Sequence, residues 1–209
     1  MDKVDFKIEF KNLYSPPSNR VEVVDVPTFN FLMVDGMGDP ASSQEYKDAA
    51  EALFAVSYAV KFTVKKGKSA VDYGVLPLEG LWWANDMNAF VEGKRDTWKW
   101  TAMIMQPKFV TGQMFQDTVV QIKKKKNLTA IPRMRFEAFR EGLSAQIMHI
   151  GPYSAEKSTV EKIHDFIKGN GYEVNGKHHE IYLGDPRKSA AQKLKTVLRQ
   201  PIRKSQLPQ

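Results

Sequence analysis

The stretch FLMVDGMGDPASSQEYKDAAEALF, residues 31–54, has a counterpart later in the chain. The counterpart is AQIMHIGPYSAEKSTVEKIHDFI, residues 145–167, at an offset of about 113 residues. Each copy reads as an apolar strand, a turn containing Gly and Pro, and a helix whose apolar residues recur at helical spacing. This repetition predicts an α+β fold made of two strand–helix–strand–strand units. Two such units would bury the concave faces of their sheets against each other or against a ligand.

The remaining elements follow from local patterns. Ser42 and Ser43 are N-cap candidates for the first helix, and period-two alternation from Trp98 onward predicts a strand. Further strands are expected at 21–34 (broken at Pro27), 73–83, 136–150 (a pair joined near Glu141–Gly142) and 179–183, and further helices at 155–168 and 189–202. The expected organisation is a lead-in at 1–20 and two units, at about 21–110 and 133–209, joined by a basic helical segment.

Composition limits the classes of function. The chain has 209 residues, 42% hydrophobic and 26% charged, as in ordinary globular proteins. It lacks cysteine and any apolar run near the ~18–20 residues needed to cross a bilayer, which favours a cytoplasmic protein without a membrane partner. The net charge of +7 lies largely in Lys123–Lys126 and in 187–204. Solvated surfaces explain both better than nucleic-acid binding, so no direct nucleic-acid partner is expected.

The stretch KHHEIYLGDPRKS, residues 177–189, places an acid and a phenol on one strand face, at Glu180 and Tyr182. Two interpretations stay open. The pair looks into an enclosed site, or Glu180 is an exposed residue paired with a lysine or with Arg187. The four histidines (His149, His164, His178, His179) do not form a metal-binding motif, so neither a metal nor a cofactor is expected.

Aromatic residues supply candidate walls for a ligand site. Only one of the adjacent Trp82 and Trp83 can face inward, and Trp83 is the candidate chosen here. The other candidates are Trp98, Trp100, Tyr73, Tyr153 and the acid Glu79. Each tryptophan is also explained by ordinary core packing. A site of this composition could hold a hydrophobic or aromatic ligand, including a cationic one, by stacking and charge complementarity. It could also let a carboxylate activate water.

Three stretches carry a resemblance to a known family. GPYSAEKSTVEKIHDFI, HHEIYLGDPRKSAAQKLKTVLR and YGVLPLEGLWW resemble GyrI-like small-molecule-binding proteins, the stand-alone relatives of multidrug-sensing effector domains. The resemblance covers residues from about Val21 to Leu198. It implies two units related by a pseudo-twofold axis around a central aromatic pocket, with a buried glutamate that by position is Glu180.

The resemblance also implies an activity. Similar stand-alone members include hydrolases that open the cyclopropane of cyclopropanoid DNA-alkylating compounds and so detoxify them. Glu180 would be the base that activates water, and Tyr182 or Tyr153 would donate a hydrogen bond to the developing oxyanion. Trp83, Trp98 and Trp100 would be the stacking walls. The alternative is a non-catalytic module that sequesters or senses drugs, or that acts on a protein partner. The oligomeric state is left open.

Overall fold

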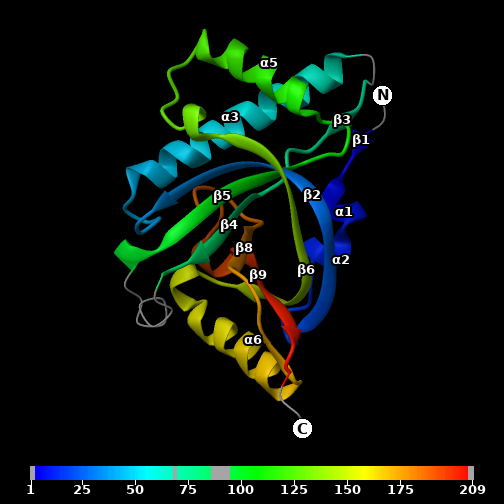
Figure 1. Ribbon diagram of the computed structural model, residues 1–209, viewed down its shortest axis with the longest axis vertical. Coiled ribbons are helices and arrows are strands. Elements are labelled where there is room, and N and C mark those ends of the chain that lie inside the picture. The colour runs from blue at the N-terminus through cyan, green and yellow to red at the C-terminus, as the bar shows by residue number, and fades with distance from the viewer. Residues whose placement is uncertain (1–2, 68–69, 86–94, 207–209) are drawn as a thin grey trace. The chain divides into compact units, whose positions relative to one another are not determined.

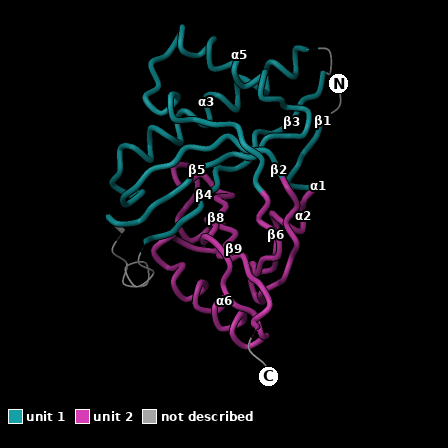
Figure 2. The backbone as a smooth tube through the Cα atoms, viewed as in Figure 1, with its two compact units in different colours: residues 1–9, 29–139 teal, residues 10–28, 140–209 magenta. Residues whose placement is uncertain are grey.

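The structure is a computed structural model that describes residues 3–67, 70–85 and 95–206, and its fold is α+β (Figure 1). The chain separates into two compact units (Figure 2). Unit 1 comprises residues 1–9 and 29–139, and unit 2 comprises residues 10–28 and 140–209. Among the described residues, no helix is both long and apolar enough to cross a membrane.

The elements of unit 1 lie mostly between residues 29 and 139. Its helices are α1 (Phe6–Glu9), α3 (Gln44–Lys66) and α5 (Gly112–Lys123). Its strands are β1 (Lys3–Val4), β3 (Asp72–Tyr73), β4 (Leu78–Trp83), β5 (Lys99–Gln106) and most of β2 (Glu22–Met37). Short 3-10 turns occur at η1 (Arg95–Thr97) and η2 (Ile131–Arg133).

Unit 2 has the same plan. Its helices are α2 (Lys11–Tyr14) and α6 (Lys157–Gly169). Its strands are most of β6 (Arg135–Ile150), then β7 (Tyr172–Val174), β8 (His178–Tyr182) and β9 (Lys195–Lys204). The 3-10 turns η3 (Tyr153–Ala155) and η4 (Ala191–Lys193) precede α6 and β9.

The predicted repeat is confirmed in the order and pairing of these elements. Unit 1 runs β2, α3, β4, β5, and unit 2 runs β6, α6, β8, β9. The last strand is central in each: β5 pairs antiparallel with β2 and β4, and β9 pairs antiparallel with β6 and β8. In unit 1, β1 and β3 add a parallel pair, and in unit 2, β7 pairs with the end of β9.

One long helix covers a sheet face in each unit (Figure 1). In unit 1, α3 packs against β5 and also against α5. It begins after Ser43, whose hydroxyl accepts a hydrogen bond from the Tyr46 amide at 3.2 Å, so this predicted N-cap is confirmed. In unit 2, a fully apolar cluster joins α6 to β6 and β9, and its members are Ala145, Ile147, Ile163, Ile167, Leu198 and Ile202.

Several boundaries differ from the expectations. The predicted helix at 189–202 is wrong, because Lys195–Lys204 forms strand β9. The expected break at Pro27 and the expected pair at 136–150 are also wrong, since β2 and β6 are each continuous. In β6, Gly142 has a positive φ of 75°, but the strand continues through it without a turn. Helix α5 lies within unit 1, and residues 10–20 of the expected lead-in lie within unit 2.

A close approach between strands fixes one glycine in unit 1. Gly36 on β2 lies opposite Trp100 on β5, and the indole of Trp100 is fully buried. A Cβ atom at Gly36 would lie only 2.8 Å from Cε2 of that indole and nearer still to Cζ2. The ring lies between strands and helix and cannot move aside freely, so a side chain at position 36 would displace it.

We expect Gly36→Ala to destabilise the protein by roughly 1–3 kcal/mol, because it overpacks a filled core. Urea unfolding followed by circular dichroism would measure this. The matched control is Gly74→Ala, where an added Cβ meets nothing within 4 Å. Equal unfolding midpoints for the two variants would contradict the assignment of Gly36 as a packing position.

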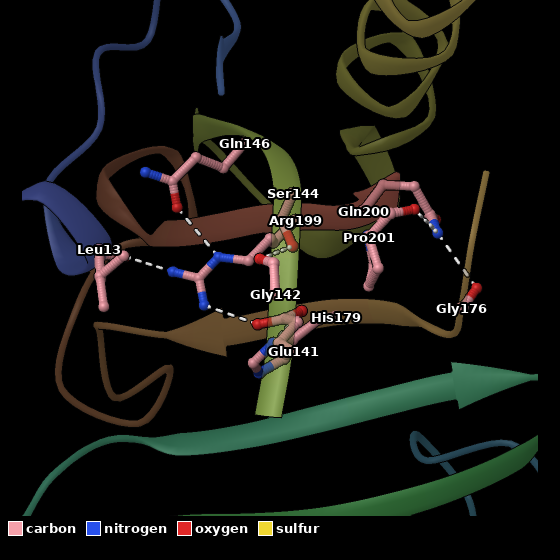
Figure 3. Close-up of polar contacts among 10 residues, drawn as sticks. All are labelled: Leu13, Glu141, Gly142, Ser144, Gln146, Gly176, His179, Arg199, Gln200 and Pro201. Atoms are coloured by element: carbon pink, nitrogen blue, oxygen red, sulfur yellow. Dashed lines mark hydrogen bonds and ion pairs between the residues drawn. The ribbon is translucent and has the colours of Figure 1, made fainter. Parts of the chain in front are cut away.

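Unit 2 contains a buried ionic network around Arg199 (Figure 3). It lies on the sheet face opposite α6, because Arg199 follows Leu198, a member of the apolar cluster beneath α6, on β9. The Arg199 guanidinium donates to Gln146 Oε1 and Glu141 Oε2, both at 3.0 Å, and to the Leu13 carbonyl at 2.7 Å. His179 Nδ1 contacts the other Glu141 oxygen at 2.9 Å. The Arg199, Glu141 and His179 side chains are at most 3% exposed. The network therefore joins β6, β8, β9 and the α2 segment.

The network sets the charge of Glu141. Burial alone would raise its pKa, but the His179 and Arg199 charges and hydrogen bonds outweigh burial and lower the pKa from 4.5 to about 2. A carboxyl group whose pKa is lower in the folded than in the unfolded protein stabilises the fold at pH values above its unfolded pKa. This contribution is lost as the pH falls through the folded pKa. The Glu141 carboxylate therefore stabilises unit 2 at neutral pH.

We expect Glu141→Gln to lower the free energy of unfolding at pH 7 by about 3–5 kcal/mol, because Arg199 stays buried without its counter-charge. The difference from wild type should shrink by about 3 kcal/mol between pH 4.5 and pH 2, as Glu141 takes up a proton in the wild type. Urea titrations across this range would measure both effects. Glu173→Gln, at a half-exposed position on β7, is the control. A constant difference at all pH values would refute the assignment.

Candidate functional site

Glu180 and Tyr182 lie on the face of the unit 2 sheet that α6 covers. On β8, Glu180 pairs with Leu198 of β9, and Tyr182 pairs with Thr196. Leu198 belongs to the apolar cluster beneath α6. Because directly paired residues project to the same face of a sheet, the acid and the phenol also project toward α6.

The carboxylate of Glu180 is held by its neighbours on β8. The Tyr182 hydroxyl donates to Glu180 Oε2 at 2.8 Å, and His178 Nε2 lies 3.6 Å from Oε1. The Glu180 side chain is only 16% exposed. Arg187, the alternative partner considered from the sequence, instead binds Asp185 through two hydrogen bonds at 3.0 Å. The arrangement is a largely buried carboxylate that accepts a hydrogen bond from a phenol.

Tyr153 completes an aromatic pair beside this carboxylate. It lies on η3, just before α6, and its ring meets the Tyr182 ring edge-on at 5.6 Å and 74°. Burial raises the pKa of Tyr153 above its ordinary value. The carboxylates that raise this pKa further are those of Glu156, Glu180 and Asp185. The phenol is therefore protonated at neutral pH and able to donate a hydrogen bond.

In unit 1, the predicted aromatic residues form a separate cluster against α3. The Tyr46 ring lies 5.1 Å from Trp100, edge-on, and 5.6 Å from Trp82. Trp98, just before β5, lies 6.2 Å from Trp82. Trp82 and Trp100 are cross-strand partners and are almost completely buried. The structure thus brings Trp98 and Trp100 together, with Trp82 as their neighbour.

The other unit 1 candidates lie elsewhere. Alternation along β4 directs the side chains of Glu79 and Trp83 to the face opposite Trp82. Trp83 therefore does not share a face with Trp98 and Trp100, as a common wall would require. Glu79 is 2% exposed. Tyr73 is buried against the rings of Phe6 and Phe109, and this burial raises its pKa. Ligand contact by any of these residues stays a prediction.

Two members of these groups were missed from the sequence. Tyr46, which the sequence shows only as one of the periodic residues of the first helix, joins the unit 1 cluster. His178 was considered only as a metal ligand, although it lies beside Glu180. Its position two residues before Glu180 on the same strand was the available indication. No sequence pattern distinguishes a tyrosine that packs on tryptophans from one that packs on aliphatic residues.

Comparisons with known proteins agree with the fold. A crystal structure of an uncharacterized conserved protein from Listeria innocua has 40% identity and a TM-score of 0.85, and the match covers 96% of this chain and 100% of that chain. A structure of a hydrolase from Listeria innocua has 40% identity, the same coverage of both chains and a TM-score of 0.82. The C-terminal domain of EcmrR shares the fold alone, at 13% identity and a TM-score of 0.57, over 88% of this chain and 98% of that one.

No curated protein matches the chain in sequence. The profile of the GyrI-like small molecule binding domain, however, matches residues 20–203, which include most of each unit and the strand that carries Glu180. The chain therefore belongs to the GyrI-like small-molecule binding domain family.

Proposed function

We propose that the protein is a hydrolase of hydrophobic, electrophilic small molecules, in which Glu180 activates water. The observation that carries this proposal is the largely buried Glu180 carboxylate, which the Tyr182 hydroxyl holds at 2.8 Å. A carboxylate fixed in this way can position a water molecule and accept its proton. A protein described as a hydrolase, 40% identical over nearly the whole chain, supports the same class of reaction.

The substrate class that we propose is the cyclopropanoid alkylators, which contain a spirocyclopropane conjugated to a carbonyl. The water oxygen attacks the cyclopropane methylene and forms a C–O bond, while the strained C–C bond breaks. The electron pair of that bond moves through the ring to the carbonyl oxygen, which becomes a phenolate and then takes up a proton. Glu180 accepts the proton of the water. The product is a ring-opened alcohol that no longer alkylates DNA.

The two tyrosines have different roles in this proposal. The Tyr182 hydroxyl already donates to Glu180, so Tyr182 orients the base. The Tyr153 hydroxyl remains to donate to the oxyanion that develops at the carbonyl. The raised pKa of Tyr153 keeps this phenol protonated. Of the two tyrosines considered from the sequence, Tyr153 is therefore the one assigned to the oxyanion.

A non-catalytic binding module is the second candidate. The observation that favours it is the grouping of carboxylates around Tyr153, which include Glu156 and Glu180. Acids beside paired aromatic rings attract flat or cationic ligands through stacking and charge complementarity. Such a protein would sequester or sense a drug without changing it.

We expect Glu180→Gln to lower kcat for a spirocyclopropyl-cyclohexadienone alkylator by about 10²–10⁴-fold, because the amide cannot accept the proton of water. The dissociation constant should change little for this neutral compound. Chromatographic detection of the ring-opened alcohol measures turnover, and isothermal titration calorimetry measures binding. Glu173→Gln, on β7 of the same unit, serves as the control. Binding by the wild type without any alcohol product would favour the binding module instead.

We expect Tyr182→Phe to lower kcat about tenfold, because Glu180 loses the hydrogen bond that orients it. The effect should vanish in a Glu180→Gln background, since the two residues act as one group. The effect of Tyr153→Phe should instead multiply with that of Tyr182→Phe, because Tyr153 acts on the substrate. Steady-state rates of the single and double variants test this. Independent effects of Tyr182 and Glu180 would exclude the orienting role.

A further inference from the structure

Thr196 lies near the start of β9, on the α6-covered face of the unit 2 sheet. It is on the central strand β9, where its cross-strand neighbours are Tyr182 on β8 and His149 on β6. The side chain is fully buried. Glu180 is one diagonal step away, at the Cα spacing of about 7–8 Å that is usual between diagonal neighbours on paired strands.

The Thr196 hydroxyl has no hydrogen-bond partner within the part of the chain that the structure describes. The polar groups next to it are engaged elsewhere. The Tyr182 hydroxyl donates to Glu180. His149 Nε2 lies 3.2 Å from the Pro152 carbonyl and Nδ1 lies 2.9 Å from the Thr159 hydroxyl. Because a carbonyl only accepts, Nε2 carries the proton, and in the neutral ring Nδ1 accepts from Thr159.

A buried hydroxyl without a partner is costly, and ordered water usually satisfies such groups. Because Thr196 lies diagonally next to Glu180, a water bound to the Thr196 hydroxyl has the Glu180 carboxylate as its second partner. A water molecule that donates to two oxygens holds them about 4.5 Å apart, because its two hydrogen bonds of about 2.8 Å meet at roughly 105°. This span suits side chains on diagonally adjacent positions of two paired strands.

Unit 1 shows what fills the same positions when no polar site is present. An offset of 113 residues superposes the helix N-caps Ser43 and Glu156, and it aligns Gly36 with His149. Trp100, which pairs with Gly36, is therefore the counterpart of Thr196. The same offset aligns Tyr46, which packs on Trp100, with Thr159.

Rings thus pack against each other in unit 1 where unit 2 has two threonine hydroxyls. The counterpart of Glu180 on β4 is Gly80, because each lies two residues before the residue that pairs with Thr196 or with Trp100. A Cβ atom added at Gly80 would lie 2.7 Å from Trp82 Nε1. The aligned position in unit 1 is closed by indole rings and has no acid. The polar groups beneath α6 are therefore a property of unit 2 and not of the repeat.

We propose that the Thr196 hydroxyl binds an ordered water molecule beside Glu180 and that this is the water Glu180 deprotonates. The second part rests on the proposed function, and the first part does not. One O–H of the water donates to the Glu180 carboxylate and the other donates to the Thr196 oxygen. A lone pair of the water oxygen then stays free to attack carbon, and Glu180 takes the proton as the C–O bond forms.

The test compares Thr196→Val, which keeps the shape and removes the hydroxyl, with Thr196→Ser, which keeps the hydroxyl. Crystal structures of wild type and Thr196→Ser should show a water within hydrogen-bond distance of the hydroxyl and of Glu180, and Thr196→Val should lack it. Thr196→Val should lower kcat for the spirocyclopropyl alkylator about 10- to 100-fold with its dissociation constant unchanged. It should also lower Tm by about 2–4 °C, whereas Thr196→Ser keeps most of the activity.

Other outcomes overturn one or both parts. If the wild-type structure shows no such water and Thr196→Val raises Tm, the hydroxyl is simply unsatisfied and the proposal fails. If the water is present but Thr196→Val turns over as fast as wild type, the water site stands and its part in the reaction is excluded. If the wild type does not open the cyclopropane, the proposed function fails, and the crystal structures and Tm values still decide the water site.

Discussion

The buried network around Arg199 fixes the register on which unit 2 depends. It joins strands β6, β8 and β9, because Gln146 and Glu141 lie on β6, Arg199 on β9 and His179 on β8. A slip of one residue between any two of these strands would move every side chain to the opposite face. Arg199 would then lie among the apolar residues beneath α6 without its carboxylate, at a cost of several kcal/mol. The native register is therefore strongly favoured over its neighbours.

The same register determines which residues share the α6-covered face. His179 and Glu180 are adjacent on β8, so the network that holds His179 on one face holds Glu180 on the other. The network also binds the Leu13 carbonyl and so attaches the α2 segment to the sheet. Adjacent residues of β8 thus use charge in two ways. On one face the Glu141 carboxylate is paired with Arg199 and His179, and on the other the Glu180 carboxylate is held by a phenol.

The sequence could predict what depends on local pattern. The repeat, the Ser43 cap and the shared face of Glu180 and Tyr182 follow from periodicity and turn chemistry, and all three are present. The sequence predicts a helix where β9 lies, because the apolar residues there also fit helical spacing and Pro201 is unusual inside a strand. The antiparallel pairing of β9 with β6 and β8 makes this segment a strand. The Arg199 network could not be predicted, because Glu141 lies 58 residues away and no local pattern joins them.

The two units show how one arrangement of elements can carry either packing or chemistry. In unit 1, Gly36 and Gly80 allow the indoles to lie directly against the strands, and aromatic contacts fill the region under α3. Unit 2 has polar side chains at the aligned positions, and buried polar groups cost free energy unless they are paired. The Arg199 network offers a fully hydrogen-bonded counterpart on the opposite face of the same strands. We infer that this rigid face allows the other face of unit 2 to keep a buried acid in a fixed orientation, which aromatic packing alone would not provide.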